Sequence, residues 1–417
     1  MILNTILMAA SPLLAPAPAC PAQGIMAIKV GRAETITEGT IHHAVILVED
    51  GKIVVVGEDL PIERGIPVID MGPDSIAIPG LVNAYSRQGL DSRGGNDSQP
   101  QLHASGELYP AYIEYAEILE AGITTLGLYP AGNGISGRAV AVRPRGETPE
   151  EMILQDDVYL KIRLRSSSSS KKMITDGFKK ADDYIEKEQK AREKWEKAKE
   201  KADKKKKSKK DEKDEKEEAK EELPPYSAPE ADPKAVAFQA LRDRELRALV
   251  AIGSAADFLH LVDAIGEEEF DWDLRVPVAR ELDLFHVKSE IGSKGCRIVL
   301  EPTLSQHPNT MRLRNMPAEL SDAGAKLVLI PRSDDVGNQR AWLRHTGEVV
   351  GAGLDRDVAL RAMTLEPAEM MGLGERLGSL SAGKDANILF FTADPFEPGT
   401  KVKAVMLEGE VVSGEMN

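Results

Sequence analysis

The chain has 417 residues, of which 42 % are hydrophobic and 29 % charged, a composition that suits one large α/β domain or two unequal globular ones and excludes a disordered or fibrous chain. Its 53 Lys and Arg against 68 Asp and Glu give a net charge of −15, which disfavours nucleic-acid partners because the phosphate backbone repels an acidic protein. With only two cysteines, Cys20 and Cys296, a cysteine-based zinc finger is excluded.

Segment 1–22 resembles a cleavable leader. Its apolar run Ile2–Ala10 is followed by prolines and by the small residues Ala17 and Ala19 ahead of Cys20. The run is far shorter than the roughly 20 residues that a membrane-spanning helix needs. We therefore expect export to the periplasm or the extracellular space, with a cytoplasmic location as the alternative, and no membrane span.

Short β-rich runs occupy segments 25–78 and 376–417. Asp50-Gly51 separates two apolar runs of the first segment, which predicts a hairpin. The expected strands are Ala44–Val48, Ile53–Val56, Asn387–Phe391, Lys403–Leu407 and Glu410–Val412. Both ends of the chain are therefore predicted to consist of strands alone.

Between these ends, over 79–375, short apolar runs alternate with helical patterns, which indicates parallel βα units. The expected strands are Leu81–Tyr85, Ile123–Leu128, Leu249–Ile252, Leu274–Val278, Arg297–Leu300 and Leu327–Ile330. The expected helices are Tyr112–Ala121, Ala256–Ile265, Ala318–Ala323 and Asp355–Met371.

Segment 166–232 interrupts this alternation of strands and helices with a run of charged residues. Lys171 to Glu222 holds 20 Lys and Arg and 17 Asp and Glu, with no proline. Acidic residues precede basic ones by four positions at Glu186–Lys190, Glu188–Arg192, Glu193–Lys197 and Asp203–Lys207, the order that stabilises a helix. The segment is predicted to be a long, solvated helical insertion.

Three stretches carry a resemblance to a known family. They are VILVEDGKIVVVGEDLP with IAIPGLVNAYS, ILEAGITTLGLYPAGNGISGRAVAV, and GLDRDVALRAMTLEPAEMMGLGERLGSLSAGKDANILFFTADPF. They resemble the amidohydrolase superfamily, and most closely its imidazolonepropionase-like branch. The resemblance implies a distorted (β/α)8 barrel over 79–375 that carries a small β-sandwich built from 25–78 and 376–417.

Members of that superfamily hydrolyse C–N and related bonds with a metal-bound hydroxide, and an His-x-His pair ends their first barrel strand. Tyr85 and Arg87 stand at these positions here, and a guanidinium has no lone pair for a metal ion. The fifth-strand and sixth-strand histidines are expected near Ala251 and near Ala279 or Arg280, where none is found.

The acid that the resemblance implies on the eighth strand is retained as Asp334 or Asp335, with Glu301 or Glu290 as optional further ligands. Because this donor set is small, we expect no cofactor, with zinc as the alternative. His307 follows the strand that ends at Leu300, so it is a candidate ligand contact at the barrel mouth.

An unpaired carboxylate is costly to bury, so we expect Arg87 to contact Asp334 or Asp335, with the Tyr85 hydroxyl nearby. Two functions follow from these residues. The first is a family member without its catalytic metal, a pseudoenzyme that binds a small molecule at the barrel mouth or serves as a subunit of a homodimer or of a heteromer with an active paralogue. The second is a hydrolase of cyclic amides that uses Asp334, Tyr85 and Arg87, either without a metal ion or with one weakly held ion.

Overall fold

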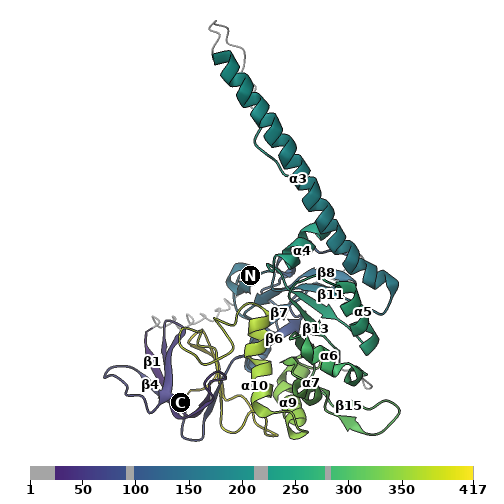
Figure 1. The fold of residues 1–417 in the computed structure, drawn as a ribbon. Coiled ribbons are helices and arrows are strands. Elements are labelled where there is room, and N and C mark those ends of the chain that lie inside the picture. The colour runs from purple at the N-terminus through teal and green to yellow at the C-terminus, as the bar shows by residue number, and fades with distance from the viewer. Residues whose placement is uncertain (1–23, 91–97, 211–223, 278–282, 417) are drawn as a thin grey trace, which may run out of the picture.

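The computed structural model describes residues 24–90, 98–210, 224–277 and 283–416 (Figure 1). The leader predicted at 1–22 lies outside these residues. None of the helices in the described ranges combines the length and the apolar character that a membrane crossing needs. The molecule consists of a sheet built from both chain ends, a larger α/β body and a projecting helix.

Both chain ends meet in one eight-stranded sheet, with the order β20-β19-β18-β5-β1-β2-β3 and with β4 on β1. The predicted hairpin is confirmed, because Asp50 and Gly51 have positive φ between the paired residues Glu49 and Lys52. These ladders join all eight strands into one sheet, where the resemblance implied a two-sheet sandwich. The strands are β1 Met26–Glu34, β2 Thr40–Glu49, β3 Lys52–Glu58, β4 Val68–Asp70, β5 Ile76–Pro79, β18 Ile388–Phe391, β19 Ala404–Leu407 and β20 Glu410–Gly414.

The α/β body contains a four-stranded sheet, β10-β9-β7-β6, and a six-stranded sheet, β17-β14-β13-β12-β11-β8. Strands β11 to β14 and β17 are parallel, as the alternating pattern predicts. The strands are β6 Leu81–Ser86, β7 Ile123–Leu128, β8 Ile135–Arg138, β9 Val140–Val142, β10 Ile153–Gln155, β11 Leu160–Arg163, β12 Ala248–Ala251, β13 Trp272–Arg275, β14 Arg297–Leu300 and β17 Lys326–Leu329.

The expectation of a closed (β/α)8 barrel needs correction, since no ladder among the described strands joins the two sheets. The reason lies at β8 and β9, which follow each other in sequence but belong to different sheets. Strand β8 runs antiparallel to β11, and β9 runs antiparallel to β7. The strands of the body are therefore mixed in direction, although the two sheets still enclose a common apolar interior that includes Val82, Leu249 and Val328.

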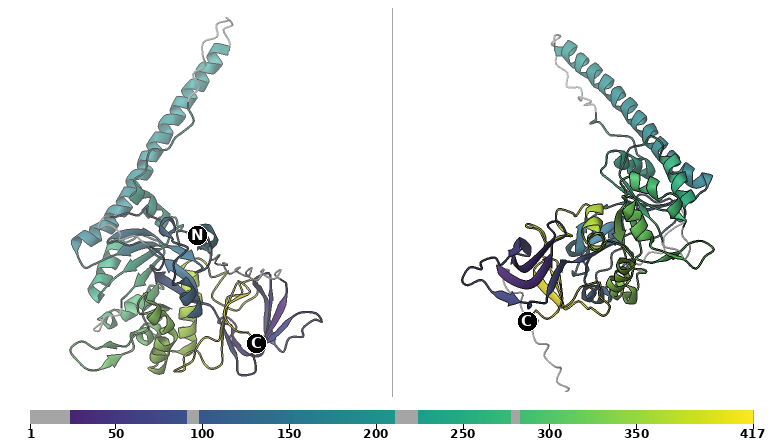
Figure 2. Two further views of the ribbon diagram at one scale, coloured as in Figure 1. Left: turned by 180° about the vertical axis from the view of Figure 1, so that it is seen from behind. Right: turned by 60° about the horizontal axis from the view of Figure 1, so that its bottom comes forward.

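Helices cover the outer faces of the two sheets (Figure 2). The predicted helix Asp355–Met371 is divided at Thr364, because Pro367 has no amide hydrogen to continue the backbone bonding. The α-helices are α1 Tyr115–Glu120, α2 Pro149–Met152, α4 Pro233–Arg242, α5 Ala255–Ile265, α6 Lys288–Ser293, α7 Met316–Asp322, α8 Val336–Arg340, α9 Trp342–Gly351, α10 Arg356–Met363 and α11 Leu365–Met370. Two short 3-10 helices, Ala104–Glu107 and Leu284–His286, and the two-stranded ribbon β15 Ser305–Gln306 with β16 Leu313–Arg314 complete the body.

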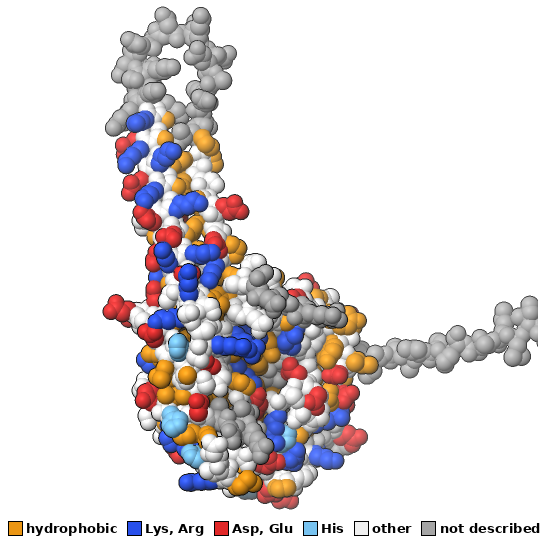
Figure 3. Space-filling view, turned by 90° about the vertical axis from the view of Figure 1, so that its right-hand side faces the viewer, with side chains coloured by type: hydrophobic (Ala, Val, Ile, Leu, Met, Phe, Trp, Pro, Cys, Tyr) orange, Lys and Arg blue, Asp and Glu red, His pale blue; other side chains and the backbone are white. Residues whose placement is uncertain are grey.

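Helix α3, Ser168–Lys210, has a buried base and a projecting stem. At the base, Phe178 is 3 % exposed and its ring lies 4.8 Å from that of Phe238 on α4. Along the stem, cationic and acidic side chains alternate (Figure 3). Of the predicted ion pairs, Glu186–Lys190 and Glu193–Lys197 form, and the side chains of Asp203 and Lys207 lie outside the described residues.

The segment that returns from the stem lies against α3. The Trp195 indole N–H donates to the carbonyl oxygen of Pro224 at 2.9 Å, and the Trp195 ring packs edge-on against Tyr226. Segment 166–232 is therefore only partly a solvated insertion. The first turns of α3 belong to the core of the body, and the returning segment packs against the stem.

Candidate functional site

The carboxyl ends of β6, β11, β12, β13 and β17 form a region that we call the mouth. Strand β11 supplies two cations to it, since Lys161 and Arg163 lie two residues apart and therefore on one face of the strand. Ile162, between them, points to the opposite face and is buried in the cluster beneath the helices. The sequence Leu-Lys-Ile-Arg-Leu-Arg thus places basic side chains on the inner face.

Strand register aligns two arginines on either side of a small residue. Arg163 on β11 pairs with Ala251 on β12, and Ala251 pairs with Arg275 on β13. Because one strand lies between them, the two arginine backbones are about 10 Å apart. The methyl group of Ala251 leaves a notch between two guanidinium-bearing side chains, and Lys161 lies one step deeper on β11.

A cavity of about 630 Å³ opens at this notch. Four cations line it, Lys161, Arg163, Arg165 and Arg275, and Asp257 is the one acidic residue of its lining. Both Asp257 oxygens already accept backbone N–H bonds, from Ser166 at 2.5 Å and from Gly253 at 2.8 Å. The lining of the cavity is therefore strongly cationic. Its other lining residues are Tyr85, Tyr129, Leu164, Ser166, Ile252, Gly253, Ser254, Ala251 and Pro277.

Lys161 is 7 % exposed and packs on aromatic rings instead of on a carboxylate. Its Nζ lies 3.9 Å from the centre of the Tyr129 ring and 5.7 Å from that of Tyr85. Burial, together with the positive charges of Arg87, Arg163 and Arg275, lowers the pKa of Lys161 to about 7. A large share of this amine is therefore uncharged at neutral pH.

Tyr85 and Tyr129 form a stacked pair beside the cations, with ring centres 4.0 Å apart. The Arg275 guanidinium lies 4.9 Å from the centre of the Tyr85 ring. Burial raises the pKa of Tyr85, so its hydroxyl stays protonated at neutral pH. The pair presents ring faces to Lys161 and Arg275 and shields both from water.

Arg275 is 7 % exposed and forms an ion pair with Glu301. Glu301 thus lies next to the cavity, but it neutralises Arg275. The Nε atom of Arg275 is buried and has no hydrogen-bond partner among the described residues. A buried donor without a partner costs free energy.

Asp334 lies at the mouth, beyond β17, and is held by Ser86, the last residue of β6, and by Arg87, which follows it. The backbone amide of Arg87 donates to Asp334 Oδ2 at 2.9 Å, and the Ser86 side chain also bonds to the carboxylate. This bond comes from the Arg87 backbone, whereas the expected contact was one of the Arg87 guanidinium. Burial raises the pKa of Asp334, while the Ser86 and Arg87 bonds and the charges of Arg87 and Arg275 act in the opposite direction.

Three of the residues singled out from the sequence lie away from this cavity. Asp335 is exposed and caps α8 by accepting the Asn338 amide hydrogen bond at 3.0 Å, and its pKa is lowered to about 2 by the Ser333 and Asn338 bonds. His307 lies in the loop between β15 and β16 and contacts Arg314 on β16. Glu290 is exposed on α6.

Sequence reasoning missed Lys161 and Arg275. The alternation of basic and apolar residues through Lys161, Arg163 and Arg165 is a signal that could have identified the first. Arg275 was missed because the sixth strand was expected to end near Ala279 or Arg280. Strand β13 ends at Arg275, and both of the expected positions lie outside the described residues.

The expectation of no cofactor is wrong. It assumed that the chain offers too few metal ligands, but a group of residues that could hold a metal ion is present. His103, Asp156 and Asp157 each offer a ligand atom, and these atoms lie within 4.8 Å of one another. One histidine and two carboxylates are donors that zinc accepts. Sequence spacing did not reveal the group because His103 is 53 residues from Asp156.

This group lies far from the mouth. Asp157 precedes the amino end of β11 and Arg163 lies at its carboxyl end, so the length of the strand, about 10 Å, lies between them. Arg138 also forms an ion pair with Asp157, at 2.6 Å. At the mouth the ligand positions hold Tyr85, Arg87, Ala251 and Arg275, which do not fit a divalent metal ion because guanidinium groups cannot coordinate it.

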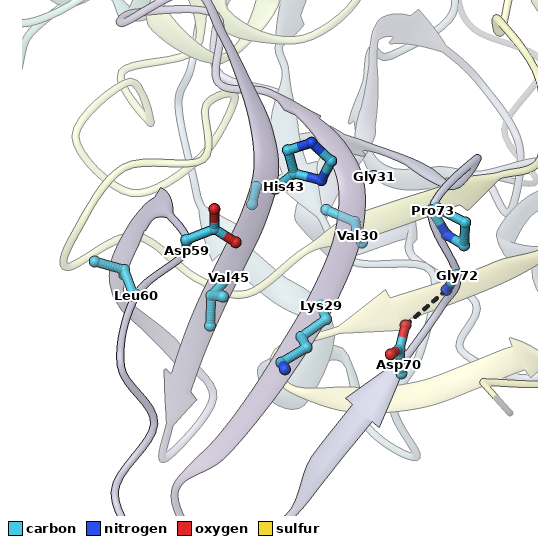
Figure 4. Close-up of a pocket in the computed structure, with 11 residues that line it drawn as sticks. Lys29, Val30, Gly31, His43, Val45, Asp59, Leu60, Asp70, Gly72 and Pro73 are labelled. Carbon is cyan, nitrogen blue, oxygen red and sulfur yellow. Dashed lines mark hydrogen bonds between the residues drawn. The ribbon is translucent and has the colours of Figure 1, made fainter.

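A second cavity, of about 290 Å³, lies on the sheet formed by the chain ends (Figure 4). Lys29, His43, Asp59 and Asp70 reach into it from β1, β2, the loop after β3, and β4. Its charges are mixed in sign, and none of these four side chains is buried. Two cations of the mouth cavity, Lys161 and Arg275, are buried, so this cavity is the stronger candidate site.

Comparison with known proteins gives a consistent result. The family model described as the amidohydrolase family matches residues 161–412. A solved amidohydrolase from Thermotoga maritima MSB8 has a TM-score of 0.73 at 21 % identity, covering 94 % of this chain and 100 % of that one. A prolidase complexed with N-methylphosphonate-L-proline has a TM-score of 0.54 at 14 % identity, covering 94 % of this chain and 100 % of its own.

A curated relative adds a short sequence match. Amidohydrolase tasK of Hapsidospora irregularis is 39 % identical over 57 residues, which are 14 % of this chain. The match covers only 6 % of the length of that relative. The two solved structures show a shared fold, and the family model covers more than half of the chain.

Proposed function

The chain belongs to the amidohydrolase family, and from that premise we propose that its mouth cavity binds a small molecule bearing a carboxylate or a phosphate. The observation that carries the proposal is the excess of cations over available anions in the cavity lining. Of its four lining cations, only Arg275 has an ion-pair partner among the described residues, Glu301. Charges gathered in this way repel one another, so a bound anion stabilises them.

The notch at Ala251 supports the same role. Arg163 and Arg275 flank it from neighbouring positions of the sheet, and guanidinium groups bind carboxylate and phosphate oxygens through paired N–H bonds. A cavity of about 630 Å³ suits a small molecule better than a polymer.

The test is calorimetric titration of the full chain with phosphate, oxalate and pyruvate. We expect saturable binding, and we expect Arg163→Gln to weaken it about tenfold, the effect of losing about 1.4 kcal/mol of interaction. The matched control is Arg312→Gln, which removes an exposed arginine from the loop between β15 and β16 and should leave the affinity unchanged. Equal affinities for the two variants, or no binding of any of the three anions, would refute the proposal.

Hydrolysis of non-peptide C–N bonds in cyclic amides is a second candidate, favoured by Asp334. This carboxylate is fixed by Ser86 and by the Arg87 amide, and burial raises its pKa toward the range in which it can accept a proton from water. Arg275 and Lys161 could polarise the amide carbonyl.

Ring opening of hydantoin and of an imidazolone by the full chain, followed by ultraviolet absorbance, tests this second role. Asp334→Asn should abolish turnover, and the neighbouring Asp335→Asn, a change in an exposed helix cap, should preserve it. Absence of turnover in the unmodified chain, with and without added zinc, would exclude hydrolysis of these compounds.

A further inference from the structure

We propose that Lys161 forms an imine with the ketone carbon of a 2-oxo acid whose carboxylate lies in the notch between Arg163 and Arg275. This inference rests on the proposed function, because it assigns the anion of that site to a chemical class. It adds a covalent step to the binding role and names the residue that performs it.

The position of Lys161 is that of a nucleophilic amine. It lines the cavity, yet it is 7 % exposed, and no described carboxylate forms an ion pair with it. Its Nζ lies against the face of Tyr129 at 3.9 Å, which keeps water from much of its surface. Desolvation and neighbouring cations are the two conditions that make a lysine amine reactive toward carbonyl groups.

The charged groups around Lys161 come from several elements. Arg87 follows β6, Arg163 shares β11 and Arg275 ends β13, and each of the three positive charges disfavours protonation of the amine. The lowered pKa, about 7, agrees with this arrangement and leaves unprotonated amine available at neutral pH. Tyr85 and Tyr129 complete its surroundings and remain protonated.

The register of the strands indicates why the ligand carries its carboxylate next to a carbonyl group. Lys161 pairs with Leu249, and Arg163 pairs with Ala251, so the amine lies one inward-facing position deeper than the arginine notch. A carboxylate held in the notch places the adjoining carbon on the side of the amine. In a 2-oxo acid that carbon is the ketone carbon.

The proposed step balances without a further reactant. The lone pair of the Lys161 nitrogen attacks the ketone carbon, and the carbonyl π electrons move to the ketone oxygen. The two hydrogens of the neutral amine then leave with that oxygen as water, and a C=N bond remains. No oxidation or reduction occurs, and the carboxylate stays intact beside the guanidinium groups.

Reductive trapping tests the inference. The full chain is incubated with pyruvate and sodium cyanoborohydride, which reduces an imine to a stable secondary amine, and the labelled lysines are mapped by peptide mass spectrometry. We expect saturable labelling at Lys161 that is lost in Lys161→Arg. The matched control is Lys384→Arg, because Lys384 is another partly buried lysine with a lowered pKa but lies outside the cavity.

The role of the ligand carboxylate is tested with acetone, a ketone that has no carboxylate. We expect Arg163→Gln to lower labelling by pyruvate about tenfold and labelling by acetone less than about twofold. Labelling of Lys161 no faster than that of Lys384 would overturn the inference even if Lys161→Arg failed to fold, because the unmodified chain supplies the comparison.

The two proposals fail in distinguishable ways. If calorimetry shows pyruvate binding that depends on Arg163 while Lys161 is not trapped, the imine is excluded and the anion site stands. If none of phosphate, oxalate and pyruvate binds, the proposed function fails, and any lysine labelling that remains reports amine reactivity without a site for the carboxylate.

Discussion

Cations lie at both ends of the parallel strands, but their partners differ between the two ends. At the amino ends, Arg247 pairs with Asp273 at 2.9 Å, and Arg297 pairs with Glu366 at 2.9 Å and with Glu369 at 2.7 Å. At the mouth, Lys161, Arg163 and Arg165 have no carboxylate partner among the described residues. Under the proposed function, the amino-end cations stabilise the fold, whereas these three mouth cations serve to bind a ligand.

The largest expected effect is on stability at the amino ends. Arg297→Ala should lower the free energy of unfolding by about 2 kcal/mol or more, because it removes one of the two arginine partners of Glu366, whose side chain is 6 % exposed, and leaves Arg361 alone on it. Arg163→Ala should cost less than about 1 kcal/mol, since no ion pair is broken. Urea unfolding of both variants measures the difference, and equal losses would contradict the comparison.

The second prediction concerns the stability cost of Lys161 and its dependence on pH. The folded-state pKa of about 7 lies below the ordinary 10.5, so between these values the unfolded chain binds more protons and stability rises with pH. Lys161→Met should therefore be more stable than the unmodified chain by about 2 kcal/mol at pH 6, and the gain should shrink as the pH approaches 10.

Urea unfolding at several pH values between 6 and 10 measures this effect. Lys326→Met is the matched control, because Lys326 is exposed at the start of β17 and its replacement should show no such trend. A gain for Lys161→Met that does not change with pH would indicate that the mouth does not disfavour the charged amine.

The third prediction separates the contribution of the shape of the notch to anion binding from that of its charge. Ala251→Leu fills the notch between Arg163 and Arg275 and removes no charge. We expect it to weaken oxalate binding about tenfold and to change the free energy of unfolding by less than about 1.5 kcal/mol, because Ala251 is only partly buried. Unchanged affinity in calorimetry would mean that the anion does not lie in the notch.

The smallest effect is expected for the stem of α3. Deleting residues 190–224 and joining the ends with a short Gly/Ser linker is feasible because Tyr226 contacts the Glu188 backbone. The deletion removes turns of α3 whose described side chains are mostly exposed, so it should change the melting temperature and the oxalate affinity little. Phe178→Ala at the buried base should instead cost about 3 kcal/mol. A large loss of stability on deletion would contradict this prediction, because it would show that the stem of α3 stabilises the α/β body.

Local patterns determined much of the fold before the structure was known. Ile123–Leu128 and Arg297–Leu300 are strands with the predicted bounds, because uninterrupted apolar runs between turn signals define buried strands. The division of helix Asp355–Met371 at Thr364 could have been anticipated from Pro367. The separation of β8 from β9 could not, because it depends on pairing with strands distant in the sequence.

The site was only partly predictable for the same reason. Asp334 and Tyr85 were identified through the family resemblance, and both lie at the mouth. Arg163 and Arg275 align across Ala251 only because of the register of β11, β12 and β13. Arg163 and Ala251, the first pair in this register, lie more than 80 residues apart in the sequence. The group of His103, Asp156 and Asp157 likewise arises from tertiary packing.

The most direct test of the central claim is a crystal structure of the full chain grown with bromide, whose anomalous scattering locates bound anions. The account predicts a bromide peak in the notch at Ala251, within contact of the Arg163 and Arg275 guanidinium groups. Bromide peaks confined to other surfaces, with the notch filled by a protein side chain, would contradict an anion site at the mouth.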